Sequence, residues 1–121
     1  MQIESQELAL VPYADLLNHN PFCSAFIERQ NRMFRAHATG NFADLASGIL
    51  QDPSMLIYLT NIENVAEAPN ENLAREYMEL FTLGEGRGYT EADIVEASRA
   101  LTGHTVNTFG NGDFVVDPEN H

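Results

Sequence analysis

Six polar residues near the middle of the chain have types and spacing that could do chemistry: Asn70, Glu71, Asn72, Arg75, Glu76 and Glu79. Residues three or four positions apart lie on the same side of a helix, so the arginine would stand between carboxylates of neighbouring turns. Adjacent carboxylates shift each other's pKa values apart, which can create an acid and a base in one site. The same carboxylates could instead hold a cation.

A structural role explains the same residues without chemistry. The asparagines and Glu71 can cap the start of a helix, and Arg75 can tie that helix to a neighbour through carboxylates or carbonyl groups. We favour this interpretation, because no complete catalytic constellation accompanies the acids. It predicts that removal of Arg75 costs about 3 kcal/mol of stability if the ion pair is buried.

A second polar group lies at the end of the sequence and could ligate a metal. It offers oxygen and imidazole ligands from His104, Asp113, Asp117, Glu119 and His121. The segment around Asn111-Gly112 lacks the acids at alternate positions that a calcium loop requires. We therefore predict a solvated tail here, with no metal and no cofactor.

The composition narrows the range of partners. The chain has 121 residues, with 18 acids against 6 bases and a net charge of −12, and every base is arginine. Such a charge repels phosphate backbones and anionic lipids, so we expect no nucleic-acid partner and no docking on a membrane. No apolar run approaches the ~20 residues of a membrane span, so we expect no direct membrane insertion. The single cysteine, Cys23, excludes an intrachain disulfide.

Hydrophobic periodicity predicts the elements that must position these side chains, namely helices over 21–38, 42–50, 52–59, 70–83 and 90–102. Asn41 and Asp52 are expected to cap the second and third of them. The helix after Asp52 is apolar nearly all round, so we expect it to be central and buried. The other apolar faces expected in the core comprise Phe26, Phe34, Phe42, Leu73, Tyr77, Leu80 and Phe81.

The helices over 70–83 and 90–102 are expected to form a hairpin around which the rest of the chain packs. Glycines alternate through 84–88, where they would stop the first helix and make the bend. The segment 90–93 resembles a capping box, with aspartate in place of the usual glutamate, and would start the second helix.

Beyond the last helix the periodicity changes to that of strands. Residues 104–116 are predicted to form a β-hairpin around Gly110-Asn111-Gly112. We therefore predict one mainly α domain over 1–121, a compact orthogonal bundle of about five or six helices with a small C-terminal β-hairpin. In this arrangement 1–20 is an arm or short helix, 21–103 is the helical core, and 104–121 is the hairpin and tail.

Several segments form a specific pattern in order along the chain. They are RAHATGNFADL at 35–45, DPSMLIYL at 52–59, NENLARE at 70–76, ELFTLG at 79–84, GYTE at 88–91, ALTG at 100–103 and FVVDP at 114–118. In this order the pattern resembles a bacterial family called domain of unknown function 1800. The chain departs from it at His104, where the family often has tryptophan, and at His121, where the family's pattern continues.

The resemblance implies a piece of a longer bacterial protein, whose parent is often exported to the periplasm or cell envelope. It implies no established activity. We expect a structural or protein-interaction role within a larger envelope-associated protein, the partner being another protein or the rest of the parent chain. The alternative is a piece of a hydrolase-like or metal-dependent enzyme, with a carboxylate and arginine site on the 70–83 helix. A pocket with two of these carboxylates facing inward and no arginine between them would favour the enzyme.

Overall fold

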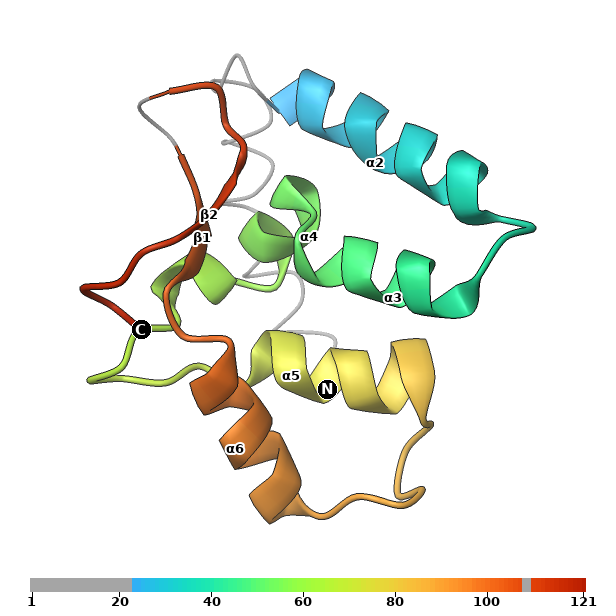
Figure 1. Cartoon of the computed structure of the whole chain (residues 1–121). Coiled ribbons are helices and arrows are strands. Elements are labelled where there is room, and N and C mark those ends of the chain that lie inside the picture. Colours follow the sequence, from blue (N-terminus) through green and yellow to red (C-terminus); the bar gives the residue numbers. More distant parts are fainter. Residues whose placement is uncertain (1–22, 108–109) are drawn as a thin grey trace, which may run out of the picture.

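The computed structural model describes residues 23–107 and 110–121 (Figure 1). The arm expected over 1–20 and the first turn of the helix expected from Pro21 lie outside the described residues. The elements, labelled as in Figure 1, are α2 (Cys23–His37), α3 (Phe42–Leu50), α4 (Pro53–Tyr58), the 3-10 helix η1 (Asn61–Glu63), α5 (Asn72–Glu76), the π-helix η2 (Tyr77–Thr82), α6 (Glu91–Ala100), β1 (His104–Val106) and β2 (Phe114–Val116). The prediction of a mainly α fold with a C-terminal hairpin is confirmed.

Local signals start the helices where the sequence places them. The side chain of Asn41 accepts a hydrogen bond from the backbone N–H of Ala43 at 2.7 Å, which caps α3. Asp52 caps α4 in the same way, through the N–H of Met55 at 2.9 Å. Thr90 and Asp93 exchange the two hydrogen bonds of a capping box at the start of α6. Each cap satisfies a backbone donor that has no partner within its own helix.

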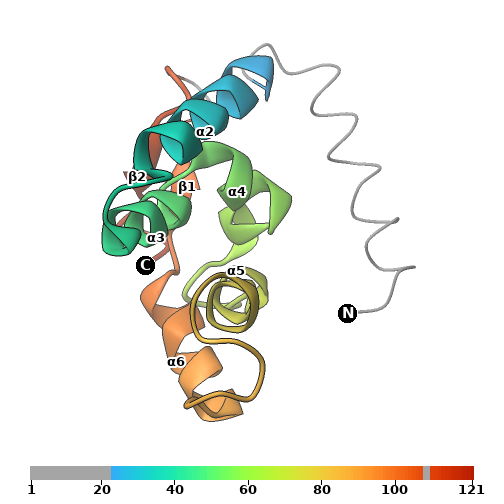
Figure 2. The ribbon, with the colours of Figure 1, turned by 90° about the vertical axis from the view of Figure 1, so that its right-hand side faces the viewer.

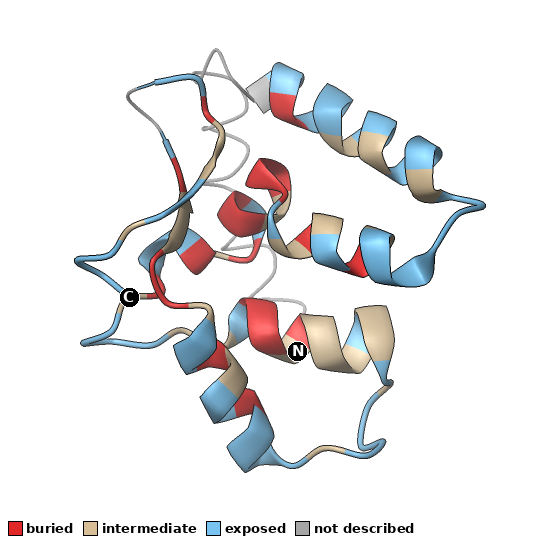
Figure 3. Cartoon of the chain, viewed as in Figure 1, coloured by how far each residue is buried: buried red, intermediate tan, exposed pale blue. Residues whose placement is uncertain are grey.

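The hydrophobic core gathers around α4, as expected for its almost wholly apolar sequence (Figure 3). Leu56 of α4 and Leu73 of α5 have no exposed surface, and Phe26 of α2 and Val106 of β1 pack into the same cluster. The exception on α4 is Tyr58, whose side chain is exposed. A single short helix therefore joins α2, α5 and the hairpin into one core.

Helices α5 and α6 form the expected helical hairpin, with α6 beneath α5 in two perpendicular views (Figures 1 and 2). Leu73 and Ile94, one from each helix, are both fully buried. The bend between them passes through the three alternate glycines, whose φ angles of 93°, 70° and 80° are all positive. The prediction that these glycines make the turn is confirmed.

Three side chains expected in the core are exposed, two of them largely and Phe34 to 37%. Leu80 is 70% exposed, because α5 continues into the π-helix η2 and a π-helix has more residues per turn than an α-helix. The i+7 position from Leu73 therefore rotates away from the core. Phe42 is 58% exposed, because it begins α3 at the end farther from α4 (Figure 1). Phe34 lies near the far end of α2 and is also exposed.

The hairpin pairs β1 with β2 in antiparallel register, with Thr105 opposite Val115. Strand β1 packs against α4 and η1, so the two-stranded sheet rests on the helical core. Such a small sheet needs this support, because an isolated two-stranded hairpin is marginally stable in water.

Candidate functional site

The structure places Arg75 at the centre of an ion-pair cluster that joins α5 to α6. Its guanidinium donates to Glu71 at 3.0 Å and to Glu79 at 3.2 Å, each one helical turn away. It also donates to both carboxylate oxygens of Glu91, at 3.0 and 2.8 Å. We call these four residues the Arg75 clamp. Two-pronged binding of a carboxylate holds the two helices in one orientation.

The contact between Arg75 and Glu91 stabilises the charged form of both groups. Hydrogen bonding to Glu91 is the main reason that the pKa of Arg75 is raised further above its usual range, and the same contact lowers the pKa of Glu91. The Arg75 side chain is 32% exposed and that of Glu91 is 75% exposed, so water screens the cluster. The Arg75 guanidinium therefore favours the ionised form of Glu91, which disfavours the use of Glu91 as a proton donor.

Glu91 was not among the residues that the sequence singled out. Its position in the first turn of α6 suits an acid for reasons of helix electrostatics alone. Only the hairpin of α5 and α6 brings it across to Arg75, 16 positions away.

Glu76 lies next to Arg75 in sequence but takes no part in the hydrogen bonds of the clamp. The residue is only 8% exposed, and within the described part of the chain its carboxylate has no hydrogen bond. Removal from water raises the pKa of Glu76, and the negative charge of Glu79 raises it further, while Arg75 offsets part of the increase. Glu76 is thus the one acid of the predicted set that is buried without a matched partner.

The two asparagines of the predicted set make their side-chain contacts outside the clamp. The side-chain amides of Asn70 and Asn72 donate to the Thr60 hydroxyl at 3.1 and 3.0 Å. Asn70 also accepts from the backbone N–H of Asn72, the first residue of α5, at 2.9 Å. Glu71 stands at the N-cap position but makes no side-chain capping bond. The six residues therefore divide into members of the clamp, a pair of asparagines bound to Thr60 and a lone buried acid, rather than lining one site.

Two further asparagines, Asn61 and Asn64, form a buried network that the sequence did not indicate. They lie in the segment between α4 and α5, and both residues are only 1% exposed. Asn61 donates to the carbonyl of Leu101 at 3.1 Å and to that of His104 at 2.8 Å. Two amides in a polar stretch, three residues apart, were the only available signal, and it is a weak one.

Asn64 completes this network, which we call the asparagine hub. Its amide donates to Asn61 at 3.1 Å and to the carbonyl of Ser98 at 2.9 Å, and its oxygen accepts from the backbone N–H of Asn70 at 2.7 Å. Its backbone carbonyl accepts from Gly103 at 2.9 Å. The hub thereby connects η1, the start of α5, the end of α6 and β1.

Gly103 shows how tightly the chain passes this point. Its φ is 73°, and a Cβ placed there would lie 2.6 Å from the carbonyl oxygen of Asp117. That carbonyl belongs to the residue whose N–H donates to Gly103 at 2.8 Å. Both the positive φ and the close approach of the backbone require glycine.

The structure brings together only His104 and His121 of the second predicted group, with ring centroids 6.2 Å apart, and the described acids of the group do not join them. Asp113 pairs with Arg29 of α2 at 2.8 Å, and Asp117 accepts from the side chain of Asn120 at 2.7 Å. His121 donates from Nδ1 to the carbonyl of Thr102 at 2.8 Å. Glu119 is exposed. Among the described residues, no group of three or more histidine, cysteine, aspartate or glutamate side chains is placed to hold a metal ion.

His104 packs edge-on against Phe114, with ring centroids 5.4 Å apart. Its Nδ1 is buried and has no hydrogen-bond partner within the described segments. Removal from water lowers the pKa of His104, and the nearby ring of His121 lowers it further. At neutral pH the His104 ring is therefore neutral and acts as part of the packing between β1 and β2.

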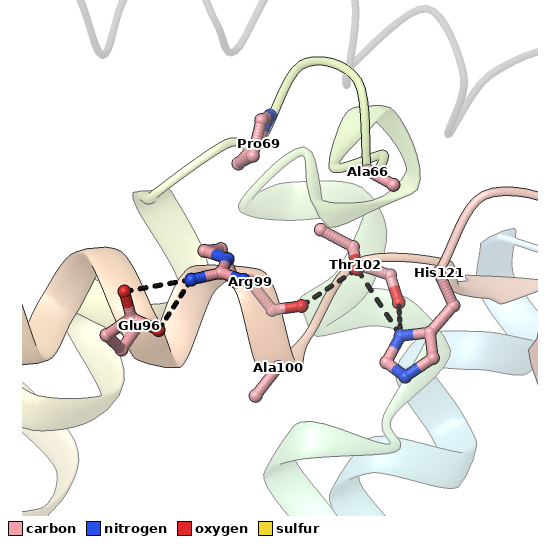
Figure 4. Close-up of a pocket in the computed structure, with 7 residues that line it drawn as sticks. All are labelled: Ala66, Pro69, Glu96, Arg99, Ala100, Thr102 and His121. Carbon is pink, nitrogen blue, oxygen red and sulfur yellow. Dashed lines mark hydrogen bonds and ion pairs between the residues drawn. The ribbon is translucent and has the colours of Figure 1, made fainter.

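A surface pocket of about 510 Å³ lies between the 64–70 loop and the C-terminal half of α6 (Figure 4). It is lined by Ala66, Pro69, Glu96, Arg99, Ala100, Thr102 and His121. Arg99 is already paired with Glu96 at 2.9 Å. None of the six predicted polar residues lines this pocket, and the carboxylates of the clamp have an arginine between them. The arrangement that would have favoured an enzyme is absent from the described residues.

No curated protein and no solved structure matches the chain. No helix in the described segments is long and apolar enough to cross a membrane. The model of the family described as protein of unknown function (DUF1800) matches residues 17–121, and the chain therefore belongs to that family.

Proposed function

We propose that this chain is a structural and protein-interaction domain within a larger envelope-associated protein. The observation that carries the proposal is the surface at the end of η2, where Leu80 is 70% exposed and Leu83, the residue directly after η2, is 51% exposed. We call these two residues the η2 apolar surface. The envelope setting rests on the family resemblance, whose members are longer and often exported.

The chemistry of the polar residues supports the same proposal. Arg75 is engaged by three carboxylates, and the asparagines are engaged by the Thr60 hydroxyl and by backbone groups, so these side chains serve the scaffold. Two large leucines on one short helical segment, in a chain with a net charge of −12, form an apolar surface in acidic surroundings. Exposed apolar surface is a mark of contact with another structure. We assign another segment of the same parent protein as its occupant.

A matched pair of stability measurements tests this proposal. Leu80→Ser and Leu83→Ser, together, should change the stability of the 121-residue chain by no more than about 0.5 kcal/mol, because both side chains already contact water. In a longer natural protein that contains the chain, the same change should cost roughly 3 kcal/mol if both leucines are covered there. Urea denaturation measures both.

Val95→Ser is the control, since Val95 is an exposed apolar residue of α6. It should be neutral in both proteins. An equal effect of the leucine substitutions in the short chain and the long protein would contradict the proposal, because it would show that no further segment covers η2.

One observation favours the enzyme alternative, namely the buried carboxylate of Glu76 with its raised pKa. Perturbed carboxyl groups are frequent in functional sites, although structural networks produce them as well. A thermal-shift screen with divalent cations and small organic acids tests this role on the parent protein, on Glu76→Gln and on Glu79→Gln. A ligand-induced shift that disappears in both variants would support the alternative over the interaction role.

A further inference from the structure

The ladder of the β-hairpin determines which backbone groups point outward. Asp117 donates to the carbonyl of Gly103 at 2.8 Å, and Asn107 donates to the carbonyl of Asp113 at 2.9 Å. These pairs belong to the hydrogen-bonded class of an antiparallel ladder, and the classes alternate along the strands. With the observed register, Val115 therefore directs its backbone N–H and C=O groups toward β1. Phe114 and Val116 direct theirs away from β1.

The two outer edges of this small sheet differ in whether their outward backbone groups have hydrogen-bond partners. On β1, the outward carbonyl of His104 accepts a hydrogen bond from the Asn61 side chain at 2.8 Å, and the strand packs on α4 and η1. On β2, the outward groups of Phe114 and Val116 have no hydrogen-bond partner within 23–107 and 110–121. One edge is closed by the core of the domain, and the other is open.

Apart from its length of only three residues, the open edge lacks the features by which proteins usually protect such strands. β2 contains no charged residue, no proline and no bulge. Val115 and Val116 are both exposed, on opposite faces of the strand, so an added strand would find an apolar side chain on each face. The edge therefore suits the addition of one more strand, a mode in which main-chain hydrogen bonds provide the affinity.

The charges beside β2 indicate what kind of strand would fit. At its start, Asp113 is already neutralised by Arg29 at 2.8 Å. At its end, Asp117 and Glu119 have no basic partner in the described part of the chain. A second copy of this chain would bring more negative charge to this point, since its net charge is −12. A basic residue would be favoured there instead.

We propose that the outer edge of β2 binds an extended segment of a protein partner as a third strand, with an arginine or lysine of that segment beside Asp117 and Glu119. This goes beyond the proposed function, because it uses a surface on the other side of the molecule from η2 (Figure 1). The two proposals can therefore fail separately. The stability measurements test the η2 apolar surface, the peptide-binding measurements test the edge of β2, and a negative result in one does not change the other.

Amide hydrogen exchange of the 121-residue chain, read by NMR, tests the geometry first. The N–H of Val115 should exchange slowly, and those of Phe114 and Val116 should exchange rapidly. On addition of a blocked hexapeptide that alternates valine and threonine and ends in arginine, the last two should become protected. Protection of both in the free chain would overturn the proposal, because the edge would then be covered already.

Matched peptides and variants make the result specific. Two versions of the peptide, N-methylated on odd or on even amides, should differ, because only one of them loses the N–H groups that face β2. A version that ends in glutamate should bind more weakly than the arginine version, and the difference should shrink with added salt. Equal binding of all four peptides would overturn the proposal.

On the protein side, Val116→Pro removes an outward N–H without touching the ladder to β1, and should weaken peptide binding by about fivefold or more. Val116→Thr keeps the N–H and should retain binding. If Val116→Pro fails to fold, the two N-methylated peptides on the unaltered chain decide the question. Dimer formation through β2, seen as a doubled mass in light scattering with Val116→Pro restoring the monomer, would also overturn the proposal, since the occupant would be a second copy.

Discussion

The asparagine hub and the Arg75 clamp both hold α6 in place, but they do so in opposite surroundings. The hub uses neutral amides that are almost completely buried, and these amides bond to each other and to defined backbone groups. The clamp uses full charges at the surface, with Arg75 32% exposed and Glu91 75% exposed. The hub is therefore neutral and almost inaccessible to water, whereas the clamp is charged and in contact with water.

This difference teaches where polar interactions contribute most to the stability of this fold. A buried amide that loses its partner leaves donors and acceptors that water cannot reach, and each such group costs about 1–3 kcal/mol. An exposed ion pair that is broken leaves charges that water solvates, so the loss is small. We therefore expect the unremarkable segment around Asn64 to matter more for stability than the conspicuous charges around Arg75.

The largest effect is expected for Asn64→Ala. The change removes three side-chain hydrogen bonds and leaves the N–H of Asn70 without its partner, so the free energy of unfolding should fall by about 3 kcal/mol. Urea denaturation measures it. Asn72→Ala is the control, because Asn72 is exposed, and should cost less than about 1 kcal/mol. Equal losses in the two variants would remove the distinction between buried and exposed amides.

A smaller effect is expected for Arg75→Met, which keeps much of the apolar stem and removes the charge. After allowance for exposure to water, we expect a loss of about 1 kcal/mol, below the 3 kcal/mol expected for a buried pair. Arg99→Met is the control, because among the described residues Arg99 pairs only within its own helix, and it should change stability by less than about 0.5 kcal/mol. A loss at Arg75 as large as that at Asn64 would contradict the comparison.

Glu76→Gln sharpens the comparison with a charge that is buried. Because the folded-state pKa of Glu76 is raised, ionisation destabilises the fold as pH rises from the ordinary value near 4.5 through the folded-state pKa. At pH 7 the glutamine variant should therefore be more stable, by a few tenths to about 1 kcal/mol, and the gain should vanish below about pH 4. Denaturation of both proteins at the two pH values tests the sign.

Glu79→Gln is the matched control on the same helix, because Glu79 accepts from Arg75 at 3.2 Å. Its substitution should lower stability at pH 7 rather than raise it. A gain in both variants would mean that general acidic repulsion, and not the burial of Glu76, explains the result.

The smallest effect is the coupling between Arg75 and Glu91, and its dependence on salt separates the two networks. In a double-mutant cycle of Arg75→Met and Glu91→Gln, the coupling should be favourable at low ionic strength and should decrease toward zero at high salt. The corresponding cycle of Asn61→Ala and Asn64→Ala should not respond to salt, because no charge is involved. A clamp that is insensitive to salt would have to be better shielded from water than the structure indicates.

The features that the sequence predicted well are those encoded within a few residues. The caps at Asn41 and Asp52, the capping box from Thr90 and the turn at 84–88 each depend on one short segment. Helix existence and the hairpin follow from periodicity in the same way. These signals need no knowledge of the rest of the chain, because the groups that they satisfy belong to neighbouring residues.

The features that the sequence missed depend on which distant groups come together. Asn64 is buried only because the carbonyl of Ser98, 34 positions later, accepts from its amide. Glu91 joins Arg75 only because the two helices pack, and Leu80 faces water only because the helix changes its pitch after Glu76. A polar residue looks the same in a sequence whether its partner is water or a backbone group across the core.

The sequence by itself determined the helices, their caps, their glycine turn and the terminal hairpin, since local hydrogen bonds and hydrophobic spacing decide these. Only the tertiary structure decided that Asn61 and Asn64 form a buried hydrogen-bond network and that Arg75 forms its ion pairs at the surface. The physical reason is that the energy of a polar side chain depends on its exposure to water and on its partner, and packing determines both.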